Sequence, residues 1–365
     1  MTTSLLPEGL RDRLPPQAET AAAMLRAALD AIRAHGYERV APPLAEYEES
    51  LAGRLKAGTA RDLLRVVDPL SQRTLALRPD ITTQVGRIAA TRLAHRPRPL
   101  RLSYGGPVVK LRASQLRPER EMTQIGAELI GHDSAAAAAE IVALSVEALS
   151  AAGAKGITVD LTLPDLVETL AAGPLPLGET AQVRALLDAK DAGGLASIGA
   201  DAWLPLIEVA GAVPEAIARL RAFDRSGALT SRIAGLEAVA ARLEGLATVT
   251  LDPTERHGFE YQSWLGFSLF AEGLTGEIGR GGAYTILHGD GREEPAIGFS
   301  IYPDPLLDVL ASEAAPRRLF LPLDHDAAAA ARLRGEGWIT VAALSEACSG
   351  AGCSHVLVGD TLKPR

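Results

Sequence analysis

The chain has 365 residues, enough for two or three domains of ordinary size. Hydrophobic residues make up 47% of the chain and charged residues 22%, a composition that excludes a mostly disordered protein. The formal net charge of −8 argues against a protein that binds nucleic acid through a broad basic surface.

The N-terminal residues carry charge where a signal peptide would need an apolar segment. Glu8, Arg11, Asp12 and Arg13 all fall within the first 14 residues. No later stretch approaches 18 uninterrupted apolar residues, so no membrane-spanning helix is expected. The sequence therefore predicts a cytoplasmic protein that does not associate with membranes.

The first part of the chain alternates helical and extended patterns. Apolar residues spaced three and four apart predict a helix over residues 17–35, and Gly36 ends it. An extended segment is expected at 37–40, because two prolines follow it directly. Further strands are predicted at 63–68, 73–77, 100–111 and 121–130, and further helices at 80–95 and 135–152.

The composition changes between residues 164 and 246, where short Ala- and Leu-rich helical stretches alternate with Gly and Pro. We interpret this segment as a helical subdomain inserted into the first domain. Strands are expected again at 247–251, 258–271, 277–287 and 296–302, followed by a helix at 306–312. Residues 313–365 predict a small appended α/β unit of the order β-α-β-α-β.

These elements predict the α+β fold class. Most of the strands follow one another as hairpins, so the main sheet should be mostly antiparallel, with helices packed on it. We assign this core to residues 1–163 and 247–312.

The common catalytic signatures are absent from the sequence. It has no Gly-x-x-x-x-Gly-Lys-Ser/Thr phosphate loop, no Gly-x-Ser-x-Gly elbow and no His-x-x-x-His zinc pair. The two cysteines, Cys348 and Cys353, are too few for a metal site or a disulfide framework, and we expect reduced thiols. No catalytic residue, metal or cofactor is predicted.

A glycine-rich run at residues 279–282 reads Gly-Arg-Gly-Gly. It is too short for a dinucleotide-binding fingerprint. The glycines indicate either a backbone that approaches another group closely or a bulge in a strand. The sequence alone leaves both interpretations open.

Polar residues are expected on one face of the sheet. Gln124 and Glu128 alternate with apolar neighbours in the strand at 121–130, so both point to the same side. The full set is Asp80, Thr82, Gln124, Glu128, Arg256 and Tyr261. Such a set could line a cavity for a small zwitterion, with carboxylates holding an ammonium or imidazolium and the Arg a carboxylate. The pattern alone favours the simpler interpretation, a solvent-exposed sheet face.

Six segments, in order, resemble the motifs of histidyl-tRNA synthetase, a class II aminoacyl-tRNA synthetase. Residues 37–43 resemble motif 1, residues 106–128 resemble motif 2, and residues 296–301 resemble the start of motif 3. Residues 77–82 resemble a Leu-Arg-Pro-Glu-Gly-Thr segment of the synthetase. The two histidine-specific segments are matched by residues 256–261 and 281–284. The resemblance spans residues 5–312. It implies a class II synthetase-like sheet and a homodimer that forms through motif 1.

The chain departs from the synthetase where ATP would bind. Lys110 and Arg112 stand where motif 2 has an Arg for the α-phosphate and a Glu for adenine, and Pro305 replaces the phosphate-binding Arg of motif 3. Lysine lacks the bidentate fork of arginine, and each lost charge-assisted contact is worth about 1.5–3 kcal/mol. The resemblance therefore implies negligible adenylate formation. The segment after residue 312 is also too short for an anticodon-binding domain.

A synthetase core that keeps its amino-acid pocket without ATP chemistry resembles the regulatory subunits of ATP phosphoribosyltransferase. Residues 77–87 fit that family's Leu-Arg-x-Asp-x-Thr-x-Gln-x-x-Arg run. Residues 281–285 depart from it, reading Gly-Gly-Ala-Tyr-Thr where Gly-Gly-Arg-Tyr-Asp is usual.

The resemblance implies a role for each residue of the polar set. Glu128 and Gln124 would meet the amine and imidazole of L-histidine, and Asp80 and Thr82 the amine. Tyr261 would close over the ring, and Arg256 would meet the carboxylate.

The resemblance also implies a non-catalytic subunit that binds the short-form catalytic subunit and transmits feedback inhibition by histidine. A homodimer core within a hetero-oligomer is expected, without nucleic acid. Histidine at the subunit interface is a further possibility. Two other functions stay open: a minimal histidine-activating ligase, and an assembly scaffold whose pocket is empty.

Overall fold

The computed structural model describes residues 6–52, 63–112, 119–256, 258, 262–310 and 317–365. The chain forms two compact units, Met1–Ala311 and Ser312–Arg365. None of the helices in the described ranges is long and apolar enough to cross a membrane.

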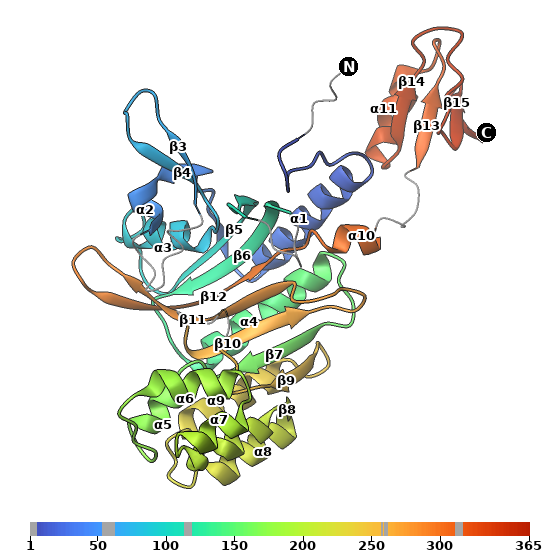
Figure 1. Ribbon diagram of the computed structural model, residues 1–365. Helices are drawn as coiled ribbons and strands as arrows, with labels where there is room; N and C mark the ends of the chain where they lie inside the picture. Colours follow the sequence, from blue (N-terminus) through green and yellow to red (C-terminus); the bar gives the residue numbers. More distant parts are fainter. Residues whose placement is uncertain (1–5, 53–62, 113–118, 257, 259–261, 311–316) are drawn as a thin grey trace. The chain divides into compact units, whose positions relative to one another are not determined.

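A nine-stranded sheet organises the larger unit (Figure 1). Across the sheet the strands are β1 (Glu38–Arg39), β5 (Leu100–Val109), β6 (Glu121–Ile130), β12 (Glu293–Ile301), β11 (Gly279–Leu287), β10 (Gln262–Phe270), β7 (Thr158–Thr162), β9 (Thr248–Leu251) and β8 (Gly211–Ala212). All neighbouring pairs are antiparallel except β1 with β5 and β7 with β9. The prediction of a mostly antiparallel sheet is confirmed.

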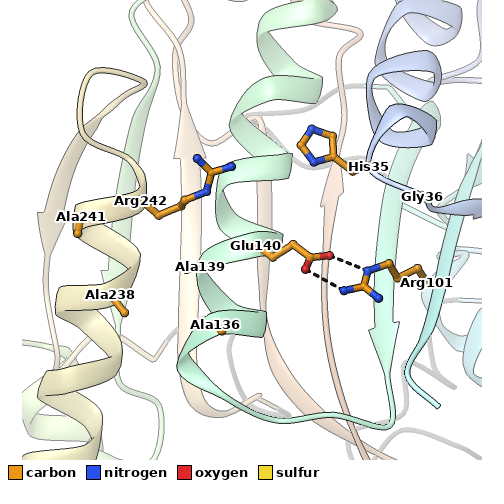
Figure 2. A pocket seen from close by; sticks show the side chains of 9 residues that line it. All are labelled: His35, Gly36, Arg101, Ala136, Ala139, Glu140, Ala238, Ala241 and Arg242. Carbon is orange, nitrogen blue, oxygen red and sulfur yellow. Dashed lines mark hydrogen bonds and ion pairs between the residues drawn. The ribbon is translucent and has the colours of Figure 1, made fainter.

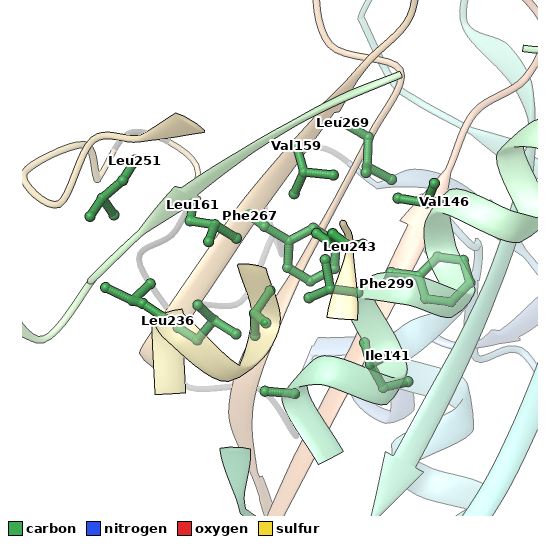
Figure 3. Packing of buried hydrophobic residues seen from close by; sticks show 14 of the residues in the cluster. Ile141, Val146, Val159, Leu161, Leu236, Leu243, Leu251, Phe267, Leu269 and Phe299 are labelled. Carbon is green, nitrogen blue, oxygen red and sulfur yellow. The ribbon is translucent and has the colours of Figure 1, made fainter. Parts of the chain in front are cut away.

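Helices α1 (Gln17–Ala34), α4 (Ala135–Ala151) and α9 (Thr230–Arg242) cover one face of this sheet. Figure 3 shows Ile141 of α4 and Leu236 of α9 packed with Phe267 and Phe299 of the strands. The N-terminus of α4 is capped by the Ser134 hydroxyl, which accepts a hydrogen bond from the amide of Ala137 at 3.1 Å. This apolar layer is the main core of the unit.

The opposite face is covered in part by α3 (Thr82–Ala90), which packs on β5, β6, β11 and β12. The helix was expected at residues 80–95, so the observed helix α3 is shorter than predicted. Its last turn ends where the Thr91 hydroxyl bonds the Arg87 carbonyl at 2.7 Å, shortly before Pro97 and Pro99. Beside α3 lies a three-stranded sheet of β2 (Ala45–Tyr47), β4 (Thr74–Leu77) and β3 (Leu64–Val67), with the short helix α2 (Glu48–Ala52).

The segment between β7 and β9 is mainly helical, as its composition predicts. It contains α5 (Leu166–Ala171), α6 (Thr180–Asp188), α7 (Ala192–Ser197), the 3-10 helix η2 (Asp201–Val209), α8 (Val213–Phe223) and α9. However, α9 packs on α4 and β8 joins the sheet, so the segment shares the core of the larger unit. The division into a core and an inserted subdomain stays a prediction. Helix α10 (Leu306–Leu310) ends the described part of this unit.

The smaller unit contains β13 (Arg318–Leu321), α11 (Ala327–Gly335), β14 (Ile339–Ala342), β15 (His355–Val358) and β16 (Thr361–Pro364). The predicted order β-α-β-α-β is wrong in its second helix. No helix lies between β14 and β15, and β15 and β16 form a hairpin. Gly350 and Gly352, both with positive φ, break the intervening segment into turns. Leu319, Leu333 and Trp338 belong to a core of its own.

Candidate functional site

Four of the predicted residues meet where α3 begins against the middle of the large sheet. Asp80 and Thr82 lie at the start of α3, and Gln124 and Glu128 lie on β6, four residues apart and therefore on one face. Gln124 and Glu128 are 0% and 1% exposed, so the expectation of a solvent-exposed sheet face is wrong. The reason is that α3 covers this face, a long-range contact that strand periodicity does not report.

Gln124 joins the strand to the start of the helix. Its amide oxygen accepts a hydrogen bond from the backbone N–H of Ile81 at 2.8 Å. Its amide nitrogen donates to Asp80 Oδ2 and to Ser300 Oγ, both at 2.7 Å. The second Asp80 oxygen accepts from the backbone N–H of Thr83 at 3.3 Å. The Gln124 side chain thus fixes the position of the Asp80 carboxylate.

Glu128 is held by two tyrosines that sequence reasoning did not assign to the site. Tyr104 donates to Glu128 Oε1 at 2.9 Å, and Tyr284 donates to Glu128 Oε2 at 2.8 Å. The Tyr104 hydroxyl also lies 2.9 Å from Thr82 Oγ1 and 3.1 Å from Ser300 Oγ. One hydrogen-bonded network therefore connects both carboxylates.

The register of the sheet explains why Tyr104 reaches both Glu128 and Ser300. Tyr104 and Ser300 stand opposite Gly126, on the two strands that flank β6. A Cβ at Gly126 would lie only 2.4 Å from the Tyr104 hydroxyl oxygen, so glycine leaves the room through which this side chain crosses β6. The sequence offered a weak signal for Tyr284, which lies in one of the synthetase-like segments, and none for Tyr104.

Burial disfavours the ionised form of both carboxyl groups. Loss of water raises the pKa of Glu128 to about 8, although the two tyrosine hydroxyls oppose this shift. Burial also raises the pKa of Asp80, against the hydrogen bond from Gln124. Neither carboxylate forms an ion pair with a basic side chain in the described part of the chain. The site therefore favours a bound group that carries positive charge or donates protons.

Of the last two predicted residues, Arg256 is not brought to this network. The Arg256 guanidinium donates to the Pro164 carbonyl at 2.6 Å and lies 4.0 Å from Glu168, at the start of the helical segment. Its backbone N–H donates to Asp188 at 2.7 Å. Tyr261 lies outside the described residues. The roles of Arg256 and Tyr261 stay predictions.

The positions that depart from the synthetase lie at the far end of β6. Lys110 follows β5 and its backbone N–H donates to the Arg120 carbonyl at 2.8 Å, while Arg112 is exposed. Pro305 lines a cavity of about 170 Å³ whose other walls include Glu119, Glu277, Asp304 and Asp308, together with Arg11. Four of the twelve residues that line this cavity are acidic and one is basic. Arginines form ion pairs with three of these acids, Glu119, Glu277 and Asp304.

A larger groove, of about 890 Å³, lies on the helix-covered face of the sheet (Figure 2). It is lined by α4 and α9, by Arg101 of β5 and by His35 and Gly36 after α1. Arg101 and Glu140 form a bidentate ion pair at its wall, with distances of 2.8 and 2.9 Å. Tyr37 donates to the same carboxylate at 2.8 Å. None of the predicted site residues lines this groove. Among the described residues, no group of three or more His, Cys, Asp or Glu is arranged to hold a metal ion.

Comparison with known proteins supplies the context for this geometry. The family model of histidyl-tRNA synthetase matches residues 9–306. A protein of Rhodospirillum centenum named ATP phosphoribosyltransferase regulatory subunit is 44% identical over 377 aligned residues, covering 99% of this chain and 96% of that protein. A protein of the same name from Paramagnetospirillum magneticum is 43% identical, covering 98% of this chain and 97% of its own.

The chain belongs to the ATP phosphoribosyltransferase regulatory subunit family.

Solved structures agree with the family and its fold. A protein of Bacillus halodurans C titled ATP phosphoribosyltransferase regulatory subunit/histidyl-tRNA synthetase superposes with a TM-score of 0.79 at 25% identity, covering 96% of this chain and 95% of that one. The histidyl-tRNA synthetase of Nostoc sp. PCC 7120 shares the fold, with a TM-score of 0.77 at 16% identity, covering 99% of this chain and 94% of that one. The resemblance to a class II synthetase is confirmed, and the names of the regulatory-subunit relatives describe a regulatory rather than a catalytic subunit.

Proposed function

We propose that this chain is the non-catalytic subunit through which histidine inhibits the first step of its own biosynthesis. It assembles as a homodimer core with the short-form catalytic subunit of ATP phosphoribosyltransferase. Phosphoribosyl transfer takes place in that partner. Histidine bound at the network of Asp80, Thr82, Gln124 and Glu128 favours one state of the assembly, which requires a coupling free energy of ~1–3 kcal/mol.

One observation carries the proposal: two buried carboxylates share a network, and neither forms an ion pair among the described residues, although the charge of Arg78 acts on Asp80. An isolated buried charge is costly, so such groups usually have a partner of opposite charge. The ammonium and imidazole of histidine offer that partner. The family membership makes histidine the ligand to test first.

The surroundings of Pro305 support a regulatory role over the alternative, a histidine-activating ligase. Asp304 Oδ2 accepts hydrogen bonds from the Arg13 guanidinium at 2.5 Å and from the backbone N–H of Thr123 at 2.9 Å. Arg13 is thus engaged by a carboxylate of the chain. Pro305 itself offers no cation to the phosphates of ATP.

Isothermal titration calorimetry separates the proposal from a scaffold with an empty pocket. Histidine is titrated into the chain alone and into its complex with the short-form catalytic subunit. We expect saturable binding in at least one of these settings, lost in a Glu128→Ala variant that still assembles. Absence of binding in both settings would favour the scaffold.

Pyrophosphate exchange separates the proposal from the ligase. The purified chain is incubated with histidine, ATP and labelled pyrophosphate. We expect no histidine-dependent label in ATP. Appreciable exchange would contradict the regulatory assignment.

A further inference from the structure

The glycine-rich segment of β11 makes room for side chains above the sheet. Gly282 stands opposite Gly298 of β12 and opposite Gly266 of β10, so three neighbouring strands lack a side chain in one row. The register of β11 against β12 is continuous through this segment. The sequence left two interpretations of the glycine-rich run at 279–282 open. A close approach of another group to the backbone is confirmed for Gly282, and the prediction of a bulge in β11 is wrong.

The space above this row holds Glu128 from one side and Gln262 from the other. A Cβ at Gly298 would lie 1.7 Å from Glu128 Oε2, and a Cβ at Gly282 would lie 2.7 Å from Gln262 Cγ. Directly opposed positions of an antiparallel pair are about 4.5–5.5 Å apart. The two side chains thus extend over adjacent positions of the sheet.

The pairing of β10 with β11 brings Gln262 next to the network. Gln262 pairs with Tyr284, whose hydroxyl donates to Glu128 Oε2 at 2.8 Å. The pairing is irregular between Gln262 and Gly266, which lets Gln262 lean over Gly282. Gln262 is therefore a neighbour of Glu128, although the two strands that carry them are not adjacent.

The amide oxygen of Gln262 differs from the other polar atoms of the site. Gln262 is 8% exposed, and its Oε1 is buried without a hydrogen-bond partner among the described residues. Gln124 and Glu128, in contrast, have all their side-chain oxygens bonded. A buried acceptor without a partner destabilises the fold, and such groups are few in native structures. The oxygen is therefore suited to a donor that the described residues do not supply.

We propose that Gln262 is a specificity-determining residue of the ligand site, its amide oxygen accepting a hydrogen bond from a ring N–H of bound histidine. Glu128 meets the other ring nitrogen. This inference rests on the proposed function, since it takes histidine as the ligand. A ring of similar size without N–H, such as the thiophene of thienylalanine, leaves the Gln262 oxygen unpaired, and a site built this way rejects it.

The test replaces the amide with an apolar group of similar size in Gln262→Leu. Calorimetry on the complex with the catalytic subunit measures the affinities for L-histidine and for thienylalanine. We expect histidine affinity to fall about 10- to 100-fold and the preference over thienylalanine to shrink with it. The melting temperature should stay the same or rise, because an unpartnered polar atom is removed. Gln182→Leu, the same change at an exposed position of α6, should alter neither.

Three outcomes would overturn the inference. Unchanged histidine affinity in Gln262→Leu, with the wild type binding normally, would remove Gln262 from the site and leave the proposed function intact. A loss of stability in Gln262→Leu would assign the amide a structural role. Failure of the wild-type complex to bind histidine would overturn the proposed function together with this inference.

Discussion

Glu128 is the residue on which the site depends most. It is 1% exposed, accepts hydrogen bonds from Tyr104 and Tyr284, and has a pKa raised to about 8 by burial. Near neutral pH the carboxyl group is therefore mostly protonated in the absence of ligand. A cationic ligand would lower this pKa again, since opposite charge favours the ionised form. Histidine binding should then release a proton.

Replacing Glu128 with Gln should reduce the pH dependence of stability. A folded-state pKa raised from 4.5 to about 8 gives a stability contribution that is present below pH 4.5 and lost as pH rises through 8. The shift corresponds to a loss on the order of 5 kcal/mol between these limits. Glu128→Gln keeps the neutral form at every pH, so urea unfolding between pH 5 and 9 should show a smaller slope than the wild type.

The matched control is Glu121→Gln, at the exposed start of the same strand. It should unfold with the pH dependence of the wild type. Equal slopes for Glu128→Gln and the wild type would show that the Glu128 carboxyl titrates normally and is not desolvated as described.

The hydrogen bonds of Gln124 are expected to contribute to the stability of the fold. Its amide satisfies the N–H of Ile81 and the carboxylate of Asp80, both at the start of α3. Gln124→Leu leaves both without this partner, and each unsatisfied buried group costs about 1–3 kcal/mol. We expect a loss of roughly 2–4 kcal/mol in the free energy of unfolding, measured with urea. A loss below about 0.5 kcal/mol, the usual range of surface substitutions, would contradict this account of the network.

At the scale of the elements, glycines decide which side chains enter the site. A Cβ at Gly298 would lie 1.7 Å from the Glu128 carboxylate and 2.7 Å from the backbone oxygen of Ala127, which cannot move freely. Gly298→Ala should therefore displace Glu128, cost about 1–3 kcal/mol of stability and abolish histidine binding in calorimetry.

Gly289→Ala is the control for this change. Gly289 lies in the turn between β11 and β12, where an added Cβ would meet nothing within 4 Å. We expect normal stability and normal histidine binding. If Gly298→Ala behaves in the same way as Gly289→Ala, the glycine row does not shape the site.

The elements also show how far the sequence predicts the structure. The helix α1 follows its apolar spacing, with Met24, Ala28 and Ile32 buried. The strands predicted at 100–111 and 121–130 form as β5 and β6, but β6 is buried on both faces. The convergence of Asp80, Gln124 and Glu128 was accessible only through the family resemblance, because the pattern does not report what covers the strand. The sequence did not predict the roles of Tyr104, Ser300 and Gln262. These side chains come close together only because of the register of five strands, which the sequence pattern does not show.

The helical segment and the C-terminal unit mark a further limit. The composition of residues 164–246 predicts helices but not that α9 packs against α4. In the C-terminal unit, the expected second helix does not form, and turns at Gly350 and Gly352 lead into a hairpin instead. Local propensity therefore predicted whether a segment is helical or extended better than it predicted which other elements the segment packs against.

At the scale of the whole molecule, the chain has the fold of a synthetase and the family of a regulatory subunit. The network around Glu128 fits an amino acid with a cationic or N–H-bearing side chain. Pro305 offers no cation to the phosphates of ATP. Both features agree with a protein that senses histidine without activating it.

The most direct test is the activity of the assembled complex. The chain and the short-form catalytic subunit are co-purified, and phosphoribosyl transfer is measured with and without histidine, for the wild type and for Glu128→Ala. We predict that both complexes assemble and are active, that histidine inhibits the wild-type complex, and that the variant complex loses this inhibition. Equal inhibition of both complexes, or a wild-type complex that histidine does not inhibit, would contradict the central claim.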